Sequence, residues 1–359
     1  QSTSYLIDVL RENVKAEKNP VSYALFVAFF PTLISGPIQK SRTMLPKINS
    51  ERRISWEDAQ IAFLTFLYGA FMKMVVADRL AVFTNAIFDN YTEYEGFYLI
   101  VAACAYSVQI YTDFAGYSYM AIAVARLFGF KLDDNFRQPY HATSIHDFWS
   151  RWHISLTSWF REYLYISLGG NRKGEFRKYL NIFIVFLVSG LWHGAAWTFV
   201  IWGAIHAIYQ IAGHLTLKTR IKICDKLKID RERAIYKMWQ RVCVFVLATF
   251  AWIFFRAPDL ESAIGFIKGM FVWNPWVLFN ETLNKVGFSD VMELRLCVVL
   301  IAVVIMVSCF REHKKTAQTI ISQPLPIRWI VYIVLMFSIF IFGMYGPNYS
   351  ASAFIYAGF

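Results

Sequence analysis

Seven apolar runs separated by polar loops organise the chain. The run 179–217 contains no Lys, Arg, Asp or Glu anywhere along its length. It is long enough for two spans, because about 20 helical residues cross a hydrocarbon core. Pro31 and the Gly36-Pro37 pair interrupt the first run, so it suits a re-entrant segment as well as a span. The pattern predicts an all-α polytopic membrane protein with ~8 spans or re-entrant segments. The runs cover residues 19–39, 59–77, 96–125, 179–217, 242–255, 296–310 and 329–345.

Residues 126–178 are too polar to span a membrane. From Phe148 to Tyr165, aromatic and aliphatic side chains alternate with charged ones at helical spacing. This pattern predicts half-buried helices that lie on one face of the membrane. Because neither a repeat nor a soluble domain interrupts the sequence, we interpret residues 1–359 as a single membrane domain that ends in a tail at 346–359. The sequence begins at Gln1 with a polar stretch, and we expect further spans to precede it.

The charge pattern predicts how the chain is oriented. Lys and Arg number 36 against 25 Asp and Glu, which gives a formal net charge of +11. The basic residues concentrate in four loops, so the positive-inside rule explains them better than nucleic-acid binding does. If neighbouring spans pair, all four loops face the cytoplasm, whereas the segment 258–292 and the C-terminus are exported. The basic loops are 40–53, 126–178, 218–241 and 311–328.

Two histidines are the strongest candidates for chemistry. His193 lies inside the charge-free run, where an ionisable side chain is costly and by default marks a functional site facing a polar cavity. The alternative is a histidine that only hydrogen-bonds two helices together. His153 precedes this run, in the amphipathic segment beside Arg151, and its alternative is an interfacial histidine. We expect the span leading to His193 to start near the helices that carry His153, so that both side chains enter one cavity.

A neutral imidazole can take a proton from a hydroxyl at neutral pH. A second imidazole, or the indole N–H groups of Trp152 and Trp192, can then hold an acyl carbonyl or a developing oxyanion. Asp113 is the sole charge in the run 96–125 and needs a partner such as an arginine or a hydroxyl cluster. It either lines the cavity and orients a histidine or, as we favour, pins a helix break at Gly116.

Other site types are not predicted. The five cysteines have no Cys-x-x-Cys spacing, and the histidines of residues 126–178 form no His-x-x-x-His pair, so we predict neither a disulfide nor a metal site. Gly169-Gly170-Asn171-Arg172 is typical of a turn with a basic end, for which a plain loop is favoured over a phosphate contact.

Six stretches, in order along the chain, carry a distinctive set of residues: Ser35–Ile38, Tyr111–Ser118, Asn135–Tyr140, Asp147–Leu156, Tyr163–Arg172 and Ser189–Phe199. Together they resemble the membrane-bound O-acyltransferase (MBOAT) family, and specifically its bacterial alginate O-acetyltransferase type. One small departure is Ser167, where the family usually has proline.

The resemblance implies that His193 is the catalytic histidine and that His153 takes the place of the family's second polar residue. The segment Phe354–Phe359 is similar to a terminal Phe-x-Tyr-x-x-Phe pattern of this subgroup. There the resemblance implies that Tyr356 accepts the acyl group and relays it. The alternative for Tyr356 is an aromatic residue at the membrane interface.

The implied activity is transfer of an acyl group, with acetyl favoured, from a cytoplasmic thioester across a bacterial inner membrane for O-acylation of an exported polysaccharide. The donor is expected to be acetyl-CoA or an acyl carrier protein, with no tightly bound cofactor. The expected partners are membrane lipid and a periplasmic or extracellular SGNH-type acetyltransferase, and no nucleic acid. Alternatives are D-alanyl, lipid or peptide acylation within the family, or a proton-coupled transporter.

Overall fold

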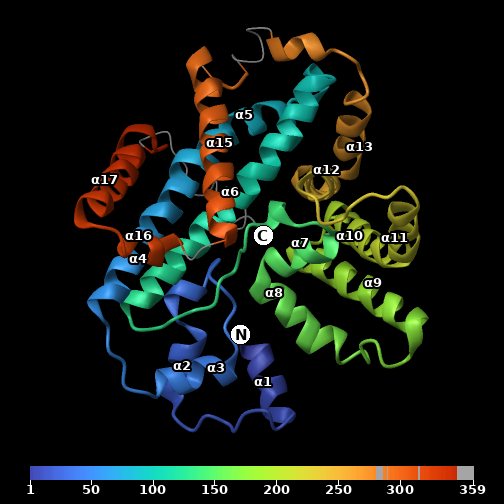
Figure 1. The fold of residues 1–359 in the computed structure, drawn as a ribbon. Helices are drawn as coiled ribbons and strands as arrows, with labels where there is room; N and C mark the ends of the chain where they lie inside the picture. The colour runs from blue at the N-terminus through green and yellow to red at the C-terminus, as the bar shows by residue number, and fades with distance from the viewer. Residues whose placement is uncertain (280–285, 289, 314–315, 346–359) are drawn as a thin grey trace.

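The computed structural model describes residues 1–279, 286–288, 290–313 and 316–345, and all regular elements in this part of the chain are helical (Figure 1). The first half contains α1 (Ser2–Leu10), α2 (Pro20–Val27), η1 (Phe30–Thr32), α3 (Ser41–Ile48), α4 (Trp56–Ala70), η2 (Phe71–Ala77), α5 (Asp78–Phe88), η3 (Tyr91–Glu93), α6 (Phe97–Leu127), η4 (Pro139–His141), α7 (Ile145–Arg151), α8 (Ile154–Trp159) and η5 (Phe160–Tyr165). The second half contains α9 (Gly174–His193), α10 (Trp197–Leu215), α11 (Leu217–Lys226), α12 (Ala234–Arg256), α13 (Leu260–Gly269), η6 (Pro275–Phe279), α15 (Val291–His313), α16 (Thr316–Ile321) and α17 (Leu325–Phe342).

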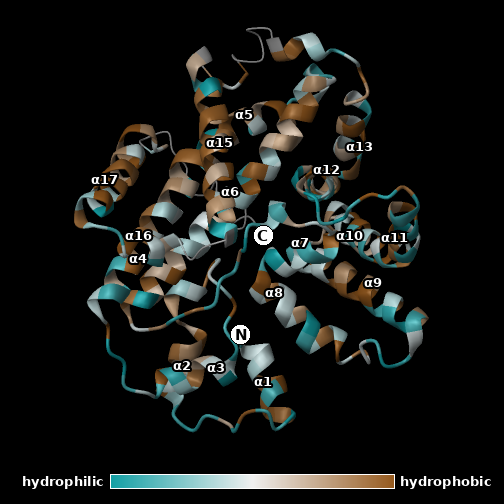
Figure 2. Cartoon of the chain, in the orientation of Figure 1, coloured by the Kyte–Doolittle hydropathy of each residue, from teal (hydrophilic) through white to brown (hydrophobic). Residues whose placement is uncertain are grey.

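Five of the seven apolar runs form single helices of the length that a membrane requires. Among the described residues, five helices are long and apolar enough to cross a membrane, and α10 and α11 together make a sixth candidate that is bent by 49°. These results confirm the all-α polytopic prediction. Figure 2 shows α15 and α17 as largely hydrophobic along their length, and α17 has no buried residue, as expected for a helix that faces lipid. The five helices are Trp56–Phe88, Phe97–Leu127, Ala234–Arg256, Met292–Glu312 and Leu325–Phe342.

Two predicted segments form helices that are too short to span a membrane, as their sequences suggest. The run 19–39 holds α2 and the single turn η1, together too short to cross a hydrocarbon core. Residues 126–178 form the short amphipathic helices α7 and α8, and α8 continues into the π-helical η5.

A close crossing joins α4 to α6, and it replaces the helix break expected at Gly116. The helix α6 runs without interruption for 31 residues through Gly116. A Cβ atom at Gly69 would stand 2.6 Å from the carbonyl oxygen of Gly116, and one at Gly116 would stand 2.7 Å from that of Gly69. Because neither glycine has a side chain, the two backbones touch. The prediction of a break is therefore wrong: Gly116 serves helix packing.

The charge-free run forms two helices, α9 and α10, that pack along each other. A Cβ atom at Gly190 would stand 2.3 Å from the carbonyl oxygen of Phe199, and one at Gly203 the same distance from that of Phe186. These contacts lock the relative position of the two helices. The turn between them begins directly after His193, which is the last residue of α9.

The main core is aromatic and lies where α6, α7, α10 and α12 meet. Its largest fully buried side chains include Trp152, Trp202, Trp252 and Tyr106. Rings of this size are packed tightly enough to exclude water and to hold neighbouring side chains in fixed rotamers.

Candidate functional site

His153 occupies the junction between α7 and α8. It is the residue before α8, its φ of +42° is left-handed, and its side chain is only 4% exposed. The extended segment that contains Asn135 lies along this junction, where the amide of Ile154 donates to the carbonyl oxygen of Asn135 at 2.9 Å. This backbone pairing brings the Asn135 side chain next to the imidazole.

The contacts of Asn135 determine the tautomer of a neutral His153. The Asn135 Oδ1 atom lies 3.2 Å from the backbone nitrogen of Ser155, 2.8 Å from the Ser155 hydroxyl and 3.1 Å from His153 Nδ1. A backbone N–H can only donate, so the shared atom is an acceptor and the amide orientation is fixed. His153 Nδ1 must then carry the hydrogen, and Nε2 carries the lone pair.

His193 lies at the end of α9 inside an aromatic enclosure. It is 3% exposed, and its ring centroid is 4.8 Å from that of Trp192, 5.2 Å from Trp202 and 5.1 Å from Phe255. The ring of Trp192 is also 6.5 Å from that of His153. The two histidines, which come from separate helical segments, are thus neighbours of one tryptophan.

The electrostatics of the two imidazoles are linked. Burial lowers the pKa of His153 well below its ordinary value, and the nearby His193 lowers it further. His153 is therefore neutral at pH 7. A neutral ring with Nδ1–H bound to Asn135 offers an acceptor at Nε2, which suits accepting a hydrogen bond or a proton rather than polarising a carbonyl.

The two candidate tryptophans differ in their surroundings. Trp152 is fully buried and packs against Phe148 and Trp252, with centroid distances of 5.6 and 4.9 Å. Trp192 is 52% exposed and covers both histidines on one side. The structure therefore places Trp152 in the core behind the site and Trp192 at its edge.

Arg151 and Asp113 have ion-pair partners of their own. Arg151 pairs with Asp147 and with Glu312, both at 2.8 Å, and so connects α7 to α15. Asp113 pairs at 2.6 Å with Lys73, which also contacts Asp78 at 2.7 Å. The partner of Asp113 is thus a lysine on the π-helical segment η2, where the sequence suggested an arginine or hydroxyl groups.

Asn135 and His206 complete the site and were not among the predicted site residues. The indole N–H of Trp149 donates to His206 Nδ1 at 3.2 Å, so a neutral His206 carries its hydrogen on Nε2. In the described part of the chain this buried N–H has no hydrogen-bond partner. The ring of Trp202 lies between His193 and His206, 5.2 and 5.1 Å from them. The sequence signal that could have identified His206 is its position inside the charge-free run 179–217.

Two further predictions concern the site. Among the described residues, no group of three His, Cys, Asp or Glu side chains is arranged to hold a metal ion. Tyr356 and the rest of the tail at 346–359 lie outside the described residues.

Comparison with known proteins identifies the family. Residues 12–256 match the profile of MBOAT, the membrane-bound O-acyltransferase family. The chain belongs to this family. The matched part contains His153, His193, Asn135 and His206, so the whole site lies within the family domain.

Proteins with curated names are similar to more than half of this chain. A probable alginate O-acetylase of Azotobacter vinelandii is 38% identical over 84% of the chain and 58% of that protein. A peptidoglycan O-acetyltransferase of Helicobacter pylori is 37% identical over 79% of the chain and 55% of that protein. A teichoic acid D-alanyltransferase of Bacillus subtilis is 29% identical over 56% of the chain and 54% of that protein. The chain thus spans little more than half the length of these relatives.

Proposed function

We propose that this chain is the catalytic part of a bacterial O-acyltransferase that passes an acetyl group from a cytoplasmic thioester towards an exported polysaccharide. The observation that carries the proposal is the pairing of His153 and His193 beside Trp192, with His153 held by Asn135. The names of the alginate and peptidoglycan relatives support acetyl as the acyl group and a polysaccharide as the final acceptor.

In the proposed reaction, His193 removes the proton of an acceptor hydroxyl while the oxygen attacks the thioester carbonyl. A C–O bond forms, the C–S bond breaks, and the proton on His193 passes to the departing thiolate. His153, with its lone pair on Nε2, steadies the His193 imidazole in the orientation that proton transfer needs. Holding both reactants in a water-poor aromatic enclosure raises their effective concentration.

A carrier is needed because the donor and the sugar are expected on opposite sides of a ~30 Å hydrocarbon core. Tyr356 is the proposed carrier: its phenol becomes nucleophilic once His193 takes its proton, and the resulting aryl ester is an activated acyl donor. An SGNH-type acetyltransferase outside the cytoplasm would receive the acetyl group next. The donor would be acetyl-CoA or an acetylated carrier protein.

Loss of thioester tests the catalytic assignment. Purified full-length protein, incubated with acetyl-CoA or with an acetylated carrier protein, should consume the thioester, whereas a proton-coupled transporter would not. His193→Ala should slow this reaction ~10²–10⁴-fold, the usual scale for a lost general base. His214→Ala is the matched control because His214 is an exposed histidine near the end of α10. Equal rates for both variants would refute the role of His193.

Tyr356→Phe tests the relay. The variant removes one hydroxyl, so we expect the protein to reach the membrane at its normal level while polysaccharide acetylation is abolished. Acid-stable label on a tyrosine of the wild-type protein would identify the intermediate. Normal acetylation in Tyr356→Phe would refute the relay and favour direct transfer to a serine of the partner.

Cysteine labelling tests the orientation. In a background without the five native cysteines, Lys222→Cys should resist a membrane-impermeant thiol reagent in intact cells, whereas Trp273→Cys should react. Both positions are exposed, so a difference reports the side of the membrane. Labelling of Lys222→Cys from outside would show that this basic loop faces away from the cytoplasm, and it would refute the proposed cytoplasmic side for the acyl donor.

A further inference from the structure

A basic hollow lies beside the first turns of α9. Its volume is about 240 Å³, and its lining is formed by η5 and by the turn that follows it. The hollow falls in the segment 126–178 that the charge pattern assigns to the cytoplasmic face. The residues that line it are Arg161, Tyr165, Ile166, Gly170, Asn171 and Arg172.

The turn that forms one wall is built and anchored. Gly169 and Gly170 have φ values of +101° and +58°, a left-handed pair that glycine adopts without strain. The buried side chain of Asn181, on α9, donates to the carbonyl oxygens of Gly170 at 2.8 Å and Leu168 at 3.3 Å. The hollow is therefore attached to the helix that ends at His193.

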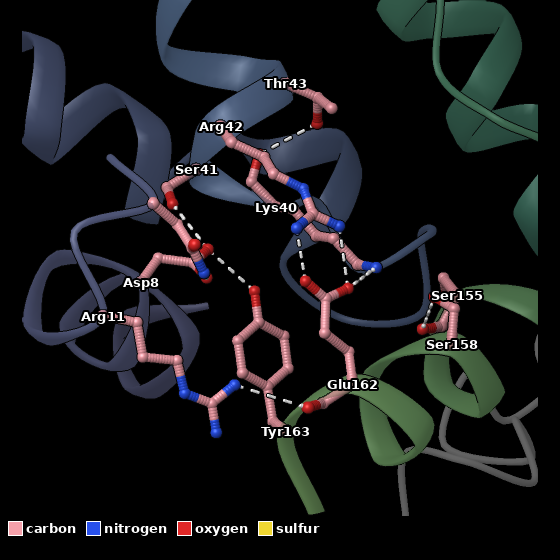
Figure 3. Close-up of polar contacts among 11 residues, drawn as sticks. Asp8, Arg11, Lys40, Ser41, Arg42, Thr43, Ser155, Ser158, Glu162 and Tyr163 are labelled. Carbon is pink, nitrogen blue, oxygen red and sulfur yellow. Dashed lines mark hydrogen bonds and ion pairs between the residues drawn. The ribbon is translucent and has the colours of Figure 1, made fainter. Parts of the chain in front are cut away.

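Next to Arg161 on η5, the negative charge of Glu162 is neutralised by two basic side chains, as Figure 3 shows. Glu162 accepts hydrogen bonds from Lys40 and from Arg42, whose Nη2 lies 2.7 Å from a carboxylate oxygen. Tyr163 donates to Asp8 at 2.8 Å. These bonds fix the rotation of the helical segment about its axis. Arg161 precedes Glu162 by about a quarter of a turn and is thereby turned towards the hollow.

The arginines of the hollow have no such partners. Within the residues that the structure describes, no ion pair or side-chain hydrogen bond involves the guanidinium group of Arg161 or Arg172. Two unpaired guanidinium groups at one small concave site form a receptor for a phosphate group, which arginine binds through paired N–H donors. By contrast, Lys40 and Arg42 form ion pairs with the carboxylate of Glu162 on the same segment.

The geometry points to a role in donor binding, which rests on the proposed function: we infer that this hollow holds the phosphate of the phosphopantetheine arm of the acyl donor. Coenzyme A and acyl carrier proteins share this arm, with a phosphate at one end and the thioester at the other. Asn181 and His193 are both on α9, and the helical rise puts them ~18 Å apart along its axis. That distance is comparable to the length of the extended arm, so a phosphate in the hollow leaves the thioester at the histidines.

The test compares two donors that share the thioester arm and differ in whether the far end of the arm carries phosphates and the attached nucleoside. Acetyl-CoA carries the phosphates, whereas acetyl-pantetheine carries the same thioester arm without them. The Arg161→Gln/Arg172→Gln variant should raise the KM for acetyl-CoA ~10- to 100-fold, because charge-assisted hydrogen bonds are lost, and leave kcat within about twofold. The KM for acetyl-pantetheine should not change. The matched control is Lys218→Gln/Lys222→Gln, which removes two exposed charges from α11.

Three outcomes would overturn the inference. The first is an unchanged KM for acetyl-CoA in the arginine variant, and the second is an equal rise in KM for both donors. The third is an effect that appears only in vesicles with anionic lipid and vanishes in pure phosphatidylcholine, which would assign the hollow to a lipid headgroup. An acetylated carrier protein, assayed in parallel, distinguishes the two sources of the arm.

Direct binding separates this inference from the proposed function. If the wild-type protein consumes no thioester, the proposed function fails, and equilibrium binding of labelled CoA then tests the hollow alone. Binding should weaken ~10- to 100-fold in the arginine variant and remain unchanged in His193→Ala. Equal CoA binding by the wild-type protein and the arginine variant would reject the hollow as the phosphate site.

Discussion

Asn135→Ala perturbs His153 without altering either histidine. The variant removes the acceptor of His153 Nδ1 and of the Ser155 backbone N–H, while the Ser155 hydroxyl can rotate to another partner. Each buried donor left unsatisfied costs ~1–3 kcal/mol. The free energy lost at His153 weakens the control of the ring's orientation, so we expect acetyl transfer to slow ~5- to 150-fold. The free energy lost at the backbone N–H of Ser155 lowers the thermal unfolding temperature of the protein.

The assay measures thioester consumption and thermal unfolding on the same purified samples. Ser118→Ala is the matched control, because it leaves the three bonds to Asn135 Oδ1 in place. It removes the contact that Asn135 Nδ2 makes at 3.3 Å and the hydrogen bond from the Ser118 hydroxyl to the carbonyl oxygen of Ser35 at 3.2 Å. Its rate should stay within about threefold of wild type. If Asn135→Ala transfers acetyl at the wild-type rate, the orientation of His153 does not matter for the reaction, and the reasoning fails.

Asn135→Asp separates orientation from simple packing. The carboxylate keeps an acceptor at the same place but adds a negative charge beside a buried imidazole, which raises the pKa of His153 from its lowered value. Because the neutral ring is the competent form, the acidic limb of the pH–rate profile should move to higher pH. A purely structural role for Asn135 would leave the profile where it is.

Three further predictions concern the scaffold, each measured by thermal unfolding in detergent. Gly69→Ala should destabilise by ~1–3 kcal/mol, because the new Cβ meets a carbonyl oxygen at 2.6 Å; a neutral result would mean that the crossing of α4 and α6 can open. Lys73→Met should cost ~3–5 kcal/mol by leaving two buried carboxylates without their cation, and adding Asp113→Asn should restore part of it. Burial raises the pKa of Glu162, but Lys40 and Arg42 outweigh it and hold the pKa below its ordinary value. Glu162 therefore contributes to the free energy of unfolding above the ordinary glutamate pKa, and this contribution is lost as the pH falls through the lowered pKa. Glu162→Gln should flatten the pH dependence of stability in this range. An unchanged pH dependence would contradict the ion pairs.

The sequence predicted the helical architecture well because hydrophobic runs and membrane thickness constrain each other directly. The failures involve contacts between distant segments. Local helix propensity predicts that Gly116 breaks its helix. Its lack of a side chain instead allows the backbone of Gly69, on another helix, to contact it closely. Lys73 was not recognised as the partner of Asp113 because it lies in a different helical segment, inside an apolar run, where nothing local marks the pair.

The candidate site was predictable in its residue types and not in its supports. His193 was proposed because an ionisable group in an apolar run stands out in a sequence, and His153 was proposed from the amphipathic segment that precedes this run. Asn135 was missed because a lone asparagine in an irregular segment resembles any loop residue, and only backbone pairing with Ile154 brings it to His153. The two tryptophans were treated alike, since sequence gives no information on which one packs inside the core.

The two histidines are positioned by different physical means, and this difference bears on how the site works. His153 is held by a hydrogen bond to a fixed amide, which defines its tautomer and the direction of its lone pair. His193 is held by the close contact of α9 with α10, through Gly190 one turn before it, and by the aromatic rings of Trp202 and Phe255. Protonation of His153 at Nε2 would leave its Nδ1–H bond to Asn135 intact, so this bond fixes the direction of the ring and does not fix its charge. A ring of fixed direction suits the orienting role proposed for His153, while the proposed reaction assigns the proton transfer to His193.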